Sequence, residues 1–170
     1  MLRDKLLQPD LVLGDIVLGL TVDLIEQHQL RGLVLDVDET LVPIRQAELA
    51  PEVIHWANYI KPRTKLWLVS NNLNTQRIQR IADCLGVPYI AGAGKPSRRK
   101  IRQAVESMDL PTNQVGIVGD RLFTDILVGN RLGLFTILVE PMAIPGEALR
   151  KTPMRTLEVW LSQFLGVSLS

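Results

Sequence analysis

The 170-residue sequence has few of the residues that build disulfides or soft-metal sites. It contains one cysteine, Cys84, and two histidines, His28 and His55. One cysteine excludes an internal disulfide and a cysteine-based zinc site, and two histidines are too few for a histidine-rich metal centre. Because Cys84 falls within an apolar helical pattern, we expect its thiol to be buried and inert.

The sequence also lacks an excess of charge and a long apolar segment. Its 19 Lys and Arg residues nearly balance its 18 Asp and Glu residues, so no global field attracts nucleic acid or a membrane. The apolar stretch 11–25 contains Asp15 and Asp23, is too short to span a bilayer and lacks the features of a secretory signal. We therefore expect a cytoplasmic protein without a nucleic-acid partner, whose contact with a membrane would be peripheral.

Short apolar runs alternate with helical patterns about five times. The expected strands are 32–37, 65–69, 89–91, 114–118 and 134–139. The expected helices between them are 51–60, a helix capped by Thr75 or Asn74 that runs to Leu85, a helix capped by Ser97 that runs to Met108, and 124–132. Nearly continuous apolar strands are typical of a parallel sheet that is buried on both faces. The pattern predicts a single three-layer α/β domain with about five parallel strands. Residues 1–31 would form a lead-in, 32–139 the catalytic core, and 140–170 a loop and helix.

Polar residues follow four of the expected strands. They are Asp36 and Asp38 at the end of the first, Ser70 after the second, Lys95 in the loop after the third, and Asp120 with Asp125 after the fourth. In a parallel sheet the carboxyl ends of the strands share one edge, where ligands bind. These residue types are the parts of a phosphoryl-transfer site: a nucleophile, an acid/base, donors to phosphate oxygens and ligands for a cation.

The two carboxylates at the end of the first strand carry the chemistry in this interpretation. Close like charges need a neutralising partner, and Mg²⁺, which prefers oxygen ligands, is the usual one. We assign Asp36 as the nucleophile that forms an aspartyl-phosphate, and Asp38 as the acid that protonates the leaving oxygen and then the base that activates water. Taken alone, this stretch has an alternative: both residues could simply cap the turn that follows.

The remaining polar residues complete the expected site. Ser70 offers a hydroxyl donor to a phosphate oxygen, and Lys95 offers a positive charge. Asp120 would hold the cation together with Asp36. Asp125 would bind the cation through water or orient Lys95, unless it is only an acid favoured by the dipole of a helix start.

The four motifs together resemble those of the haloacid dehalogenase (HAD) superfamily of phosphatases. The matching residues are Asp36-Val37-Asp38-Glu39-Thr40 for DxDxT, Ser70 for the second motif, Lys95 for the third, and Gly119-Asp120 with Asp125 for the fourth. Many members carry glycine where this chain has Glu39. The resemblance covers about 32–139 and implies a Rossmann-like fold. It assigns catalysis to Asp36, Asp38, Ser70 and Lys95, Mg²⁺ binding to Asp36, Asp38, Asp120 and Asp125, and substrate binding to Thr40, Asn71 and Arg98.

The spacing of the motifs leaves no room for the cap domain that many HAD enzymes carry. The segments between Asp38 and Ser70, and between Ser70 and Lys95, hold only a helix, a strand and their loops. An open site suits a phosphate presented on something large, such as a protein, a nucleic acid end or a lipid head group. A phosphomutase, which usually needs a cap to exclude water, is disfavoured.

Several local sequences are similar to a narrower group, the YqeG-type proteins, which are related to the mitochondrial-type phosphatidylglycerophosphatases. These sequences are LDVDETLVP, SNN, GKP and GDRLFTDI. The resemblance implies dephosphorylation of phosphatidylglycerophosphate to phosphatidylglycerol. The alternatives are a capless phosphatase acting on phosphoprotein, nucleic acid ends or small soluble phosphates, and a non-catalytic binding protein on the HAD fold.

Two features are consistent with an anionic lipid partner. Residues 95–102 include five basic side chains, which would favour an anionic surface or simply form a solvated helix face. Apolar residues recur at helical spacing near the C-terminus, from Met154 to Leu165. That helix could pack on the domain, on a second subunit of a homo-oligomer, or on a membrane.

Overall fold

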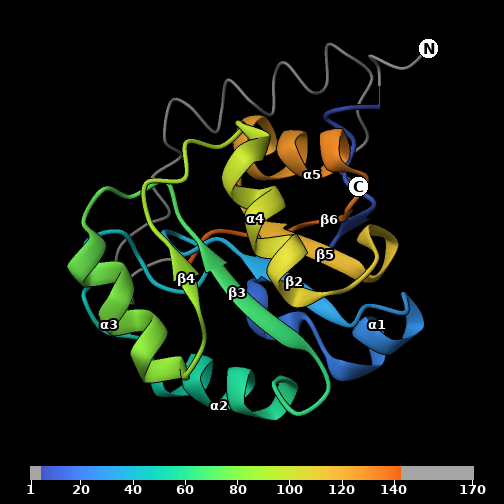
Figure 1. Cartoon of the computed structure of the whole chain (residues 1–170). Coiled ribbons are helices and arrows are strands. Elements are labelled where there is room, and N and C mark those ends of the chain that lie inside the picture. The colour runs from blue at the N-terminus through green and yellow to red at the C-terminus, as the bar shows by residue number, and fades with distance from the viewer. Residues whose placement is uncertain (1–4, 143–170) are drawn as a thin grey trace.

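One parallel sheet of six strands forms the centre of the protein in a computed structural model that describes residues 5–142 (Figure 1). The strands are β1 (Leu11–Val12), β2 (Gly32–Leu35), β3 (Lys65–Val69), β4 (Tyr89–Ile90), β5 (Val115–Gly119) and β6 (Phe135–Leu138). They lie in the order β1-β6-β5-β2-β3-β4, and every pair is parallel. The predicted α/β class with a parallel sheet is confirmed, with one strand more than expected.

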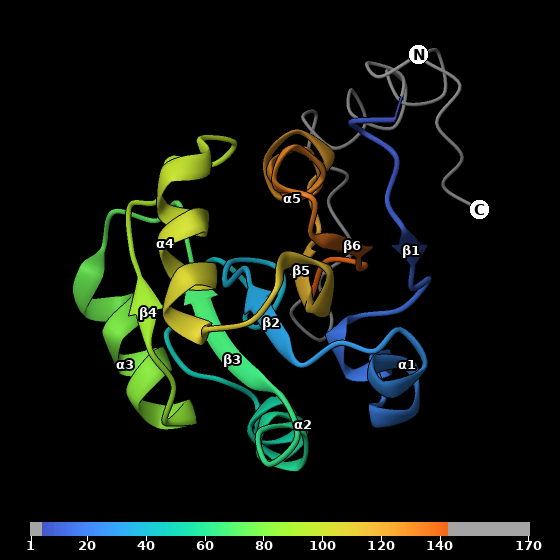
Figure 2. The same cartoon turned by 45° about the vertical axis from the view of Figure 1, so that its right-hand side comes forward.

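Helices cover both faces of the sheet, which gives three layers (Figure 2). The α-helices are α1 (Val22–Gln27), α2 (Pro51–Ile60), α3 (Thr75–Leu85), α4 (Arg98–Met108) and α5 (Leu127–Leu132). Shorter turns are the 3₁₀ helices η1 (Val17–Gly19) and η2 (Thr112–Gln114) and the π-helix η3 (Leu122–Ile126). Apolar residues of α1, α2 and α3 pack on one face, and those of α4 and α5 pack on the other.

Local sequence explains where the helices begin and end. Pro51 is the first residue of α2, where its missing N–H costs no hydrogen bond. Asn74 caps α3 by accepting a hydrogen bond from Arg77 N, and Gly86 closes it with a φ of 65°. The buried residues of α3 follow a helical stripe from Ile78 to Leu85.

The expectation that Cys84 is buried is wrong, because its side chain is exposed. The buried stripe of α3 consists of Ile78, Ile81, Ala82 and Leu85. Position 84 falls outside that stripe, so the thiol points away from the core. The apolar neighbours in sequence therefore lie on a different side of the helix.

The additional strand, β1, has only two residues, too few for a periodic signal. It pairs with β6 at the sheet edge, where Leu11 lies opposite Ile137. Two side chains hold this edge together: Thr136 N donates to Asp10 Oδ2 at 2.8 Å, and Asp10 N donates to Thr136 Oγ1 at 2.9 Å. The lead-in thus extends the sheet as well as covering it.

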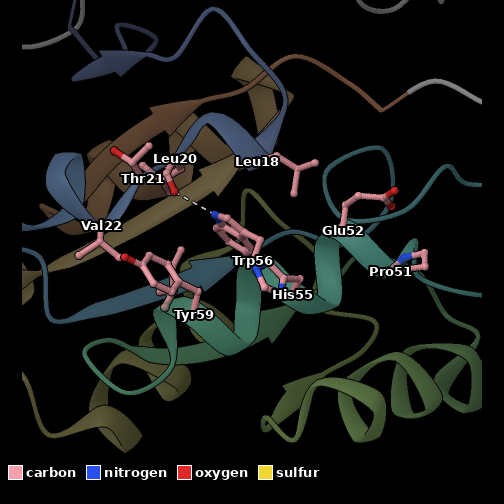
Figure 3. Close-up of a pocket in the computed structure, with 10 residues that line it drawn as sticks. Leu18, Leu20, Thr21, Val22, Pro51, Glu52, His55, Trp56 and Tyr59 are labelled. Carbon is pink, nitrogen blue, oxygen red and sulfur yellow. Dashed lines mark hydrogen bonds between the residues drawn. The ribbon is translucent and has the colours of Figure 1, made fainter.

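A pocket of about 610 Å³ lies between the segment 18–22 and α2 (Figure 3). Trp56 Nε1 donates a hydrogen bond to Leu20 O at 2.9 Å beside it. None of the residues that line this pocket belongs to the predicted active site. Within residues 5–142, no helix combines the length and apolarity that crossing a membrane would require. The predicted C-terminal helix falls outside the described residues.

Candidate active site

The order of the strands brings several of the predicted site residues to one place. From β2 the chain moves outward through β3 and β4, then returns to β5 on the other side of β2. The loops after β2 and β5 therefore diverge at a topological switch point, where α/β sheets bind ligands. Asp36 directly follows β2, and Asp120 directly follows β5.

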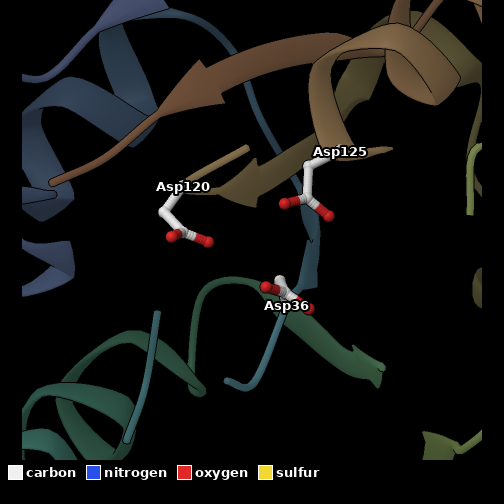
Figure 4. Close-up of side chains that lie close together, drawn as sticks. All are labelled: Asp36, Asp120 and Asp125. Atoms are coloured by element: carbon white, nitrogen blue, oxygen red, sulfur yellow. The ribbon is translucent and has the colours of Figure 1, made fainter. Parts of the chain in front are cut away.

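Three buried carboxylates converge at this point (Figure 4). One carboxylate oxygen from each of Asp36, Asp120 and Asp125 lies within 4.8 Å of those of the other two. Oδ2 of Asp125 is buried and accepts no hydrogen bond within the described residues. An all-oxygen set with an unsatisfied buried oxygen fits a hard divalent cation.

Lys95 lies between two of these carboxylates. Its Nζ donates to Asp36 Oδ1 at 2.8 Å and to Asp125 Oδ1 at 2.7 Å, and its side chain is buried. Burial alone would lower the pKa of Lys95, but the charges of Asp125 and Asp36 raise it above its ordinary value. Lys95 therefore stays charged, and it partly neutralises the carboxylate group.

Burial acts in the opposite direction on Asp125. It raises the pKa of this carboxyl to about 6, with a further increase from the Asp36 charge, although Lys95 opposes both. The site thus holds more negative charge than Lys95 alone can balance. A bound cation would supply the missing positive charge.

Gly119 makes room for the Asp125 carboxylate. A Cβ atom at position 119 would overlap Oδ2 and Cγ of Asp125. Sterics therefore explain why glycine stands at position 119, before Asp120. Only a residue without a side chain lets η3 place Asp125 against the end of β5.

Asp38 lies apart from the three-carboxylate group. Its Oδ1 accepts from Arg77 Nη1 at 2.5 Å, and its Oδ2 accepts from Asn72 Nδ2 at 2.9 Å. Of the four residues predicted to bind Mg²⁺, the structure brings the carboxylates of Asp36, Asp120 and Asp125 together. The Asp38 carboxylate faces Arg77, and a role for Asp38 in holding the cation stays a prediction. Neither Arg77 nor Asn72 was among the predicted site residues.

Two hydrogen bonds connect the loop after β3 to the loop that carries Lys95. Asn71 Nδ2 donates to Lys95 O at 3.0 Å, and Lys95 N donates to Asn71 Oδ1 at 2.7 Å. Ser70 is buried, its carbonyl accepts from Ala93 N, and its Oγ accepts from Asn72 N at 3.0 Å. The side-chain amide of Asn71 is thus engaged with the Lys95 backbone, and a contact with substrate stays a prediction.

The other two predicted substrate-binding residues occupy different surroundings. Thr40 is fully buried, and its Oγ1 donates to Asp36 Oδ2 at 3.4 Å, so it lies beside the expected nucleophile. Arg98 is exposed at the first position of α4. Among the described residues it makes no hydrogen bond or ion pair to the site residues.

Glu39 has a left-handed backbone, with a φ of 65°. Its position is the one where many HAD sequences carry glycine, which adopts this conformation without strain. The Glu39 side chain compensates in part, because its Oε1 accepts a hydrogen bond from Ile44 N at 3.2 Å.

Comparison with known proteins agrees with this geometry. The family model described as HAD-hydrolase-like matches residues 92–155. A probable phosphatase, YqeG of Bacillus subtilis (strain 168), is 35% identical over 128 residues, which cover 75% of this chain and 74% of that protein. The chain belongs to the HAD-like hydrolases. It is a phosphatase of that superfamily with a buried group of three aspartates.

Two further relatives of this HAD phosphatase show how far the similarity extends. The chloroplastic phosphatidylglycerophosphate phosphatase 1 of Chlamydomonas reinhardtii is 28% identical over 146 residues, covering 79% of this chain and 54% of that protein. The chain thus spans about half the length of that relative. The structure of a HAD-like family hydrolase from Porphyromonas gingivalis superposes with a TM-score of 0.54 at 12% identity, covering 76% and 98% of the two chains, and shows the shared fold.

Proposed function

We propose that this HAD phosphatase hydrolyses phosphomonoesters with Mg²⁺ through an aspartyl-phosphate on Asp36. The observation that carries the proposal is the position of Asp36. Its carboxylate shares the sheet edge with Asp120 and Asp125, is held by Lys95 and Thr40, and precedes Asp38 by two residues. Mg²⁺ held by Asp36, Asp120 and Asp125 would neutralise phosphate charge.

The proposed reaction has two steps. In the first, a carboxylate oxygen of Asp36 bonds to phosphorus, the ester bond breaks, and Asp38 donates a proton to the departing oxygen. In the second, Asp38 takes a proton from water, whose oxygen bonds to phosphorus as the acyl-phosphate bond breaks. Phosphate leaves and Asp36 is restored. The Ser70 hydroxyl and the Lys95 ammonium would hold phosphate oxygens in both steps.

The substrate we propose is phosphatidylglycerophosphate. A relative bears the name of that activity. Between Asp36 and Asp120 the chain contains only the helices and strands of the core and their loops, so no inserted domain covers the edge. Loops at this edge also expose Leu73, by 85%, and Ile44, by 52%, and α4 begins with the exposed residues Arg98 and Arg99. Apolar and cationic side chains together suit an anionic lipid surface.

Phosphate release across a panel of substrates tests this proposal. With Mg²⁺, turnover of phosphatidylglycerophosphate in anionic vesicles should exceed that of soluble phosphosugars, phosphopeptides and nucleotides. Asp36→Asn should abolish turnover of every substrate. Replacing Arg98, Arg99 and Arg102 by Gln should weaken vesicle binding while sparing 4-nitrophenyl phosphate. Hydrolysis of small soluble phosphates only would contradict the lipid substrate, and turnover by Asp36→Asn would contradict the mechanism.

A further inference from the structure

We propose that Arg77 is a positioning residue for Asp38. The inference rests on the proposed function, in which Asp38 is the acid and then the base. Arg77 lies in the first turn of α3, outside the four motifs that identify the family. Its link to catalysis is a contact across 39 positions of the sequence.

Both oxygens of the Asp38 carboxylate accept hydrogen bonds from side chains of one segment, which runs from the loop after β3 into α3. Arg77 Nη1 donates to Oδ1 and Asn72 Nδ2 donates to Oδ2. The side chains of Arg77 and Asp38 are only 12% and 17% exposed. A charge-assisted hydrogen bond that is partly shielded from water restricts orientation more than an exposed ion pair does.

Arg77 is itself fixed by the rest of its guanidinium group. Its Nε and Nη2 both donate to Gln46 O, at 3.3 and 2.9 Å. Gln46 belongs to the loop between β2 and α2, so the guanidinium joins that loop, the start of α3 and Asp38. The planar fork of arginine makes these three bonds from three nitrogens in fixed positions, whereas a lysine ammonium offers one nitrogen at the end of a flexible stem.

This arrangement suits an acid/base that has to lie in line with a breaking bond. A rotation of the Asp38 side chain would remove its carboxylate from the departing oxygen and from the incoming water, and small misplacements of this kind are costly. An ionised carboxylate can accept about four hydrogen bonds. Asp38 therefore keeps acceptor capacity for a proton while Arg77 and Asn72 hold it.

The test compares Arg77→Gln with Arg80→Gln, which changes an exposed arginine of the same helix. The full chain with Mg²⁺ is assayed on phenyl phosphate and 4-nitrophenyl phosphate, which are similar in shape. Phenolate is the poorer leaving group and depends more on the acid. Arg77→Gln should lower kcat about 100-fold on phenyl phosphate and less than about 10-fold on 4-nitrophenyl phosphate. Arg77→Gln should also produce a burst of nitrophenol, because a misplaced Asp38 slows hydrolysis of the phosphorylated enzyme after nitrophenol has left.

Further variants separate positioning from a general structural role. Arg80→Gln should leave both activities unchanged, and Arg77→Lys should restore part of the loss. In an Asp38→Asn background, Arg77→Gln should cause no further loss, because it acts through Asp38. If Arg77→Gln does not fold, the same comparison with Arg77→Lys decides.

Two results would overturn the inference: equal losses on both substrates without a burst, or a further loss in the Asp38→Asn background. Asp36→Asn distinguishes this failure from failure of the proposed function. If Asp36→Asn is inactive while Arg77→Gln behaves like Arg80→Gln, only the role of Arg77 is wrong. If Asp36→Asn keeps its turnover, the mechanism itself is wrong.

Discussion

At the scale of single residues, the site contains four buried ionisable side chains whose charges need partners: Asp36, Lys95, Asp120 and Asp125. Asp36, Asp120 and Asp125 would repel one another strongly, and Lys95 Nζ donates to Asp36 and to Asp125. A buried charge without a partner is costly, so the group favours either protonation or a bound cation. Burial, and next the charge of Asp36, raise the pKa of Asp125 to about 6.

Cation affinity should therefore depend on pH near that value. A cation binds the ionised form of Asp125, so a proton competes with it at this carboxylate. Between pH 7.5 and pH 6 the affinity for Mg²⁺ should change little. Below about pH 6 it should fall by up to about tenfold per pH unit for one displaced proton. Calorimetric titration with Mg²⁺ measures this directly.

The matched control for the titration is Asp83→Asn, which changes an exposed carboxylate on α3 and should reproduce the wild-type pH dependence. Asp125→Asn should bind Mg²⁺ weakly and lose the dependence. An affinity that stays constant from pH 7.5 to pH 5 would show that Asp125 does not compete for protons as described here.

At the scale of elements, local sequence signals predicted several boundaries well. The predictions for α2 and β3 match the structure residue for residue, and α3 ends at Leu85 before Gly86 as expected. Of the two caps considered for α3, the structure uses Asn74. The helix expected over 124–132 is instead a π-helix followed by α5. The wider turn, in which Ile126 N donates to Arg121 O, has no sequence signal.

At the scale of elements we also predict the effect of substituting the two glycines of strand β5, Gly116 and Gly119. A Cβ at 119 would overlap the Asp125 carboxylate, whereas a Cβ at 116 would approach the side-chain ends of Leu33 and Leu30. Each alanine substitution should destabilise the protein by about 1–3 kcal/mol through overpacking. Gly119→Ala should also displace Asp125 and greatly reduce turnover and Mg²⁺ affinity, whereas Gly116→Ala should keep both.

Chemical denaturation, calorimetric titration with Mg²⁺ and assay on 4-nitrophenyl phosphate measure these effects together. Two alanine variants with similar stability and opposite activities would support a specific role for Gly119. Full activity and Mg²⁺ affinity in Gly119→Ala would show that Asp125 does not need the space that the glycine leaves.

At the scale of the whole molecule, the order of the strands decides how much of the site the sequence reveals. Asp36, Lys95, Asp120 and Asp125 follow strands of a parallel sheet, so their meeting could be predicted from topology alone. The contact between Arg77 and Asp38 could not, because it depends on how two irregular loops fold against the start of α3. The two-residue strand β1 could not be predicted from the sequence for a similar reason: hydrogen bonds between Asp10 and Thr136, far apart in the chain, hold it in place.

The measurement that tests the central claim most directly is the identity of the phosphorylated residue. Asp38→Asn protein, mixed with 4-nitrophenyl phosphate and Mg²⁺ and quenched in acid, should retain the intermediate because its base is missing. Peptide mass spectrometry should then find one phosphoryl group on Asp36, and none in protein that also carries Asp36→Asn. A phosphoryl group on a different residue, or undiminished turnover by Asp36→Asn, would contradict the account.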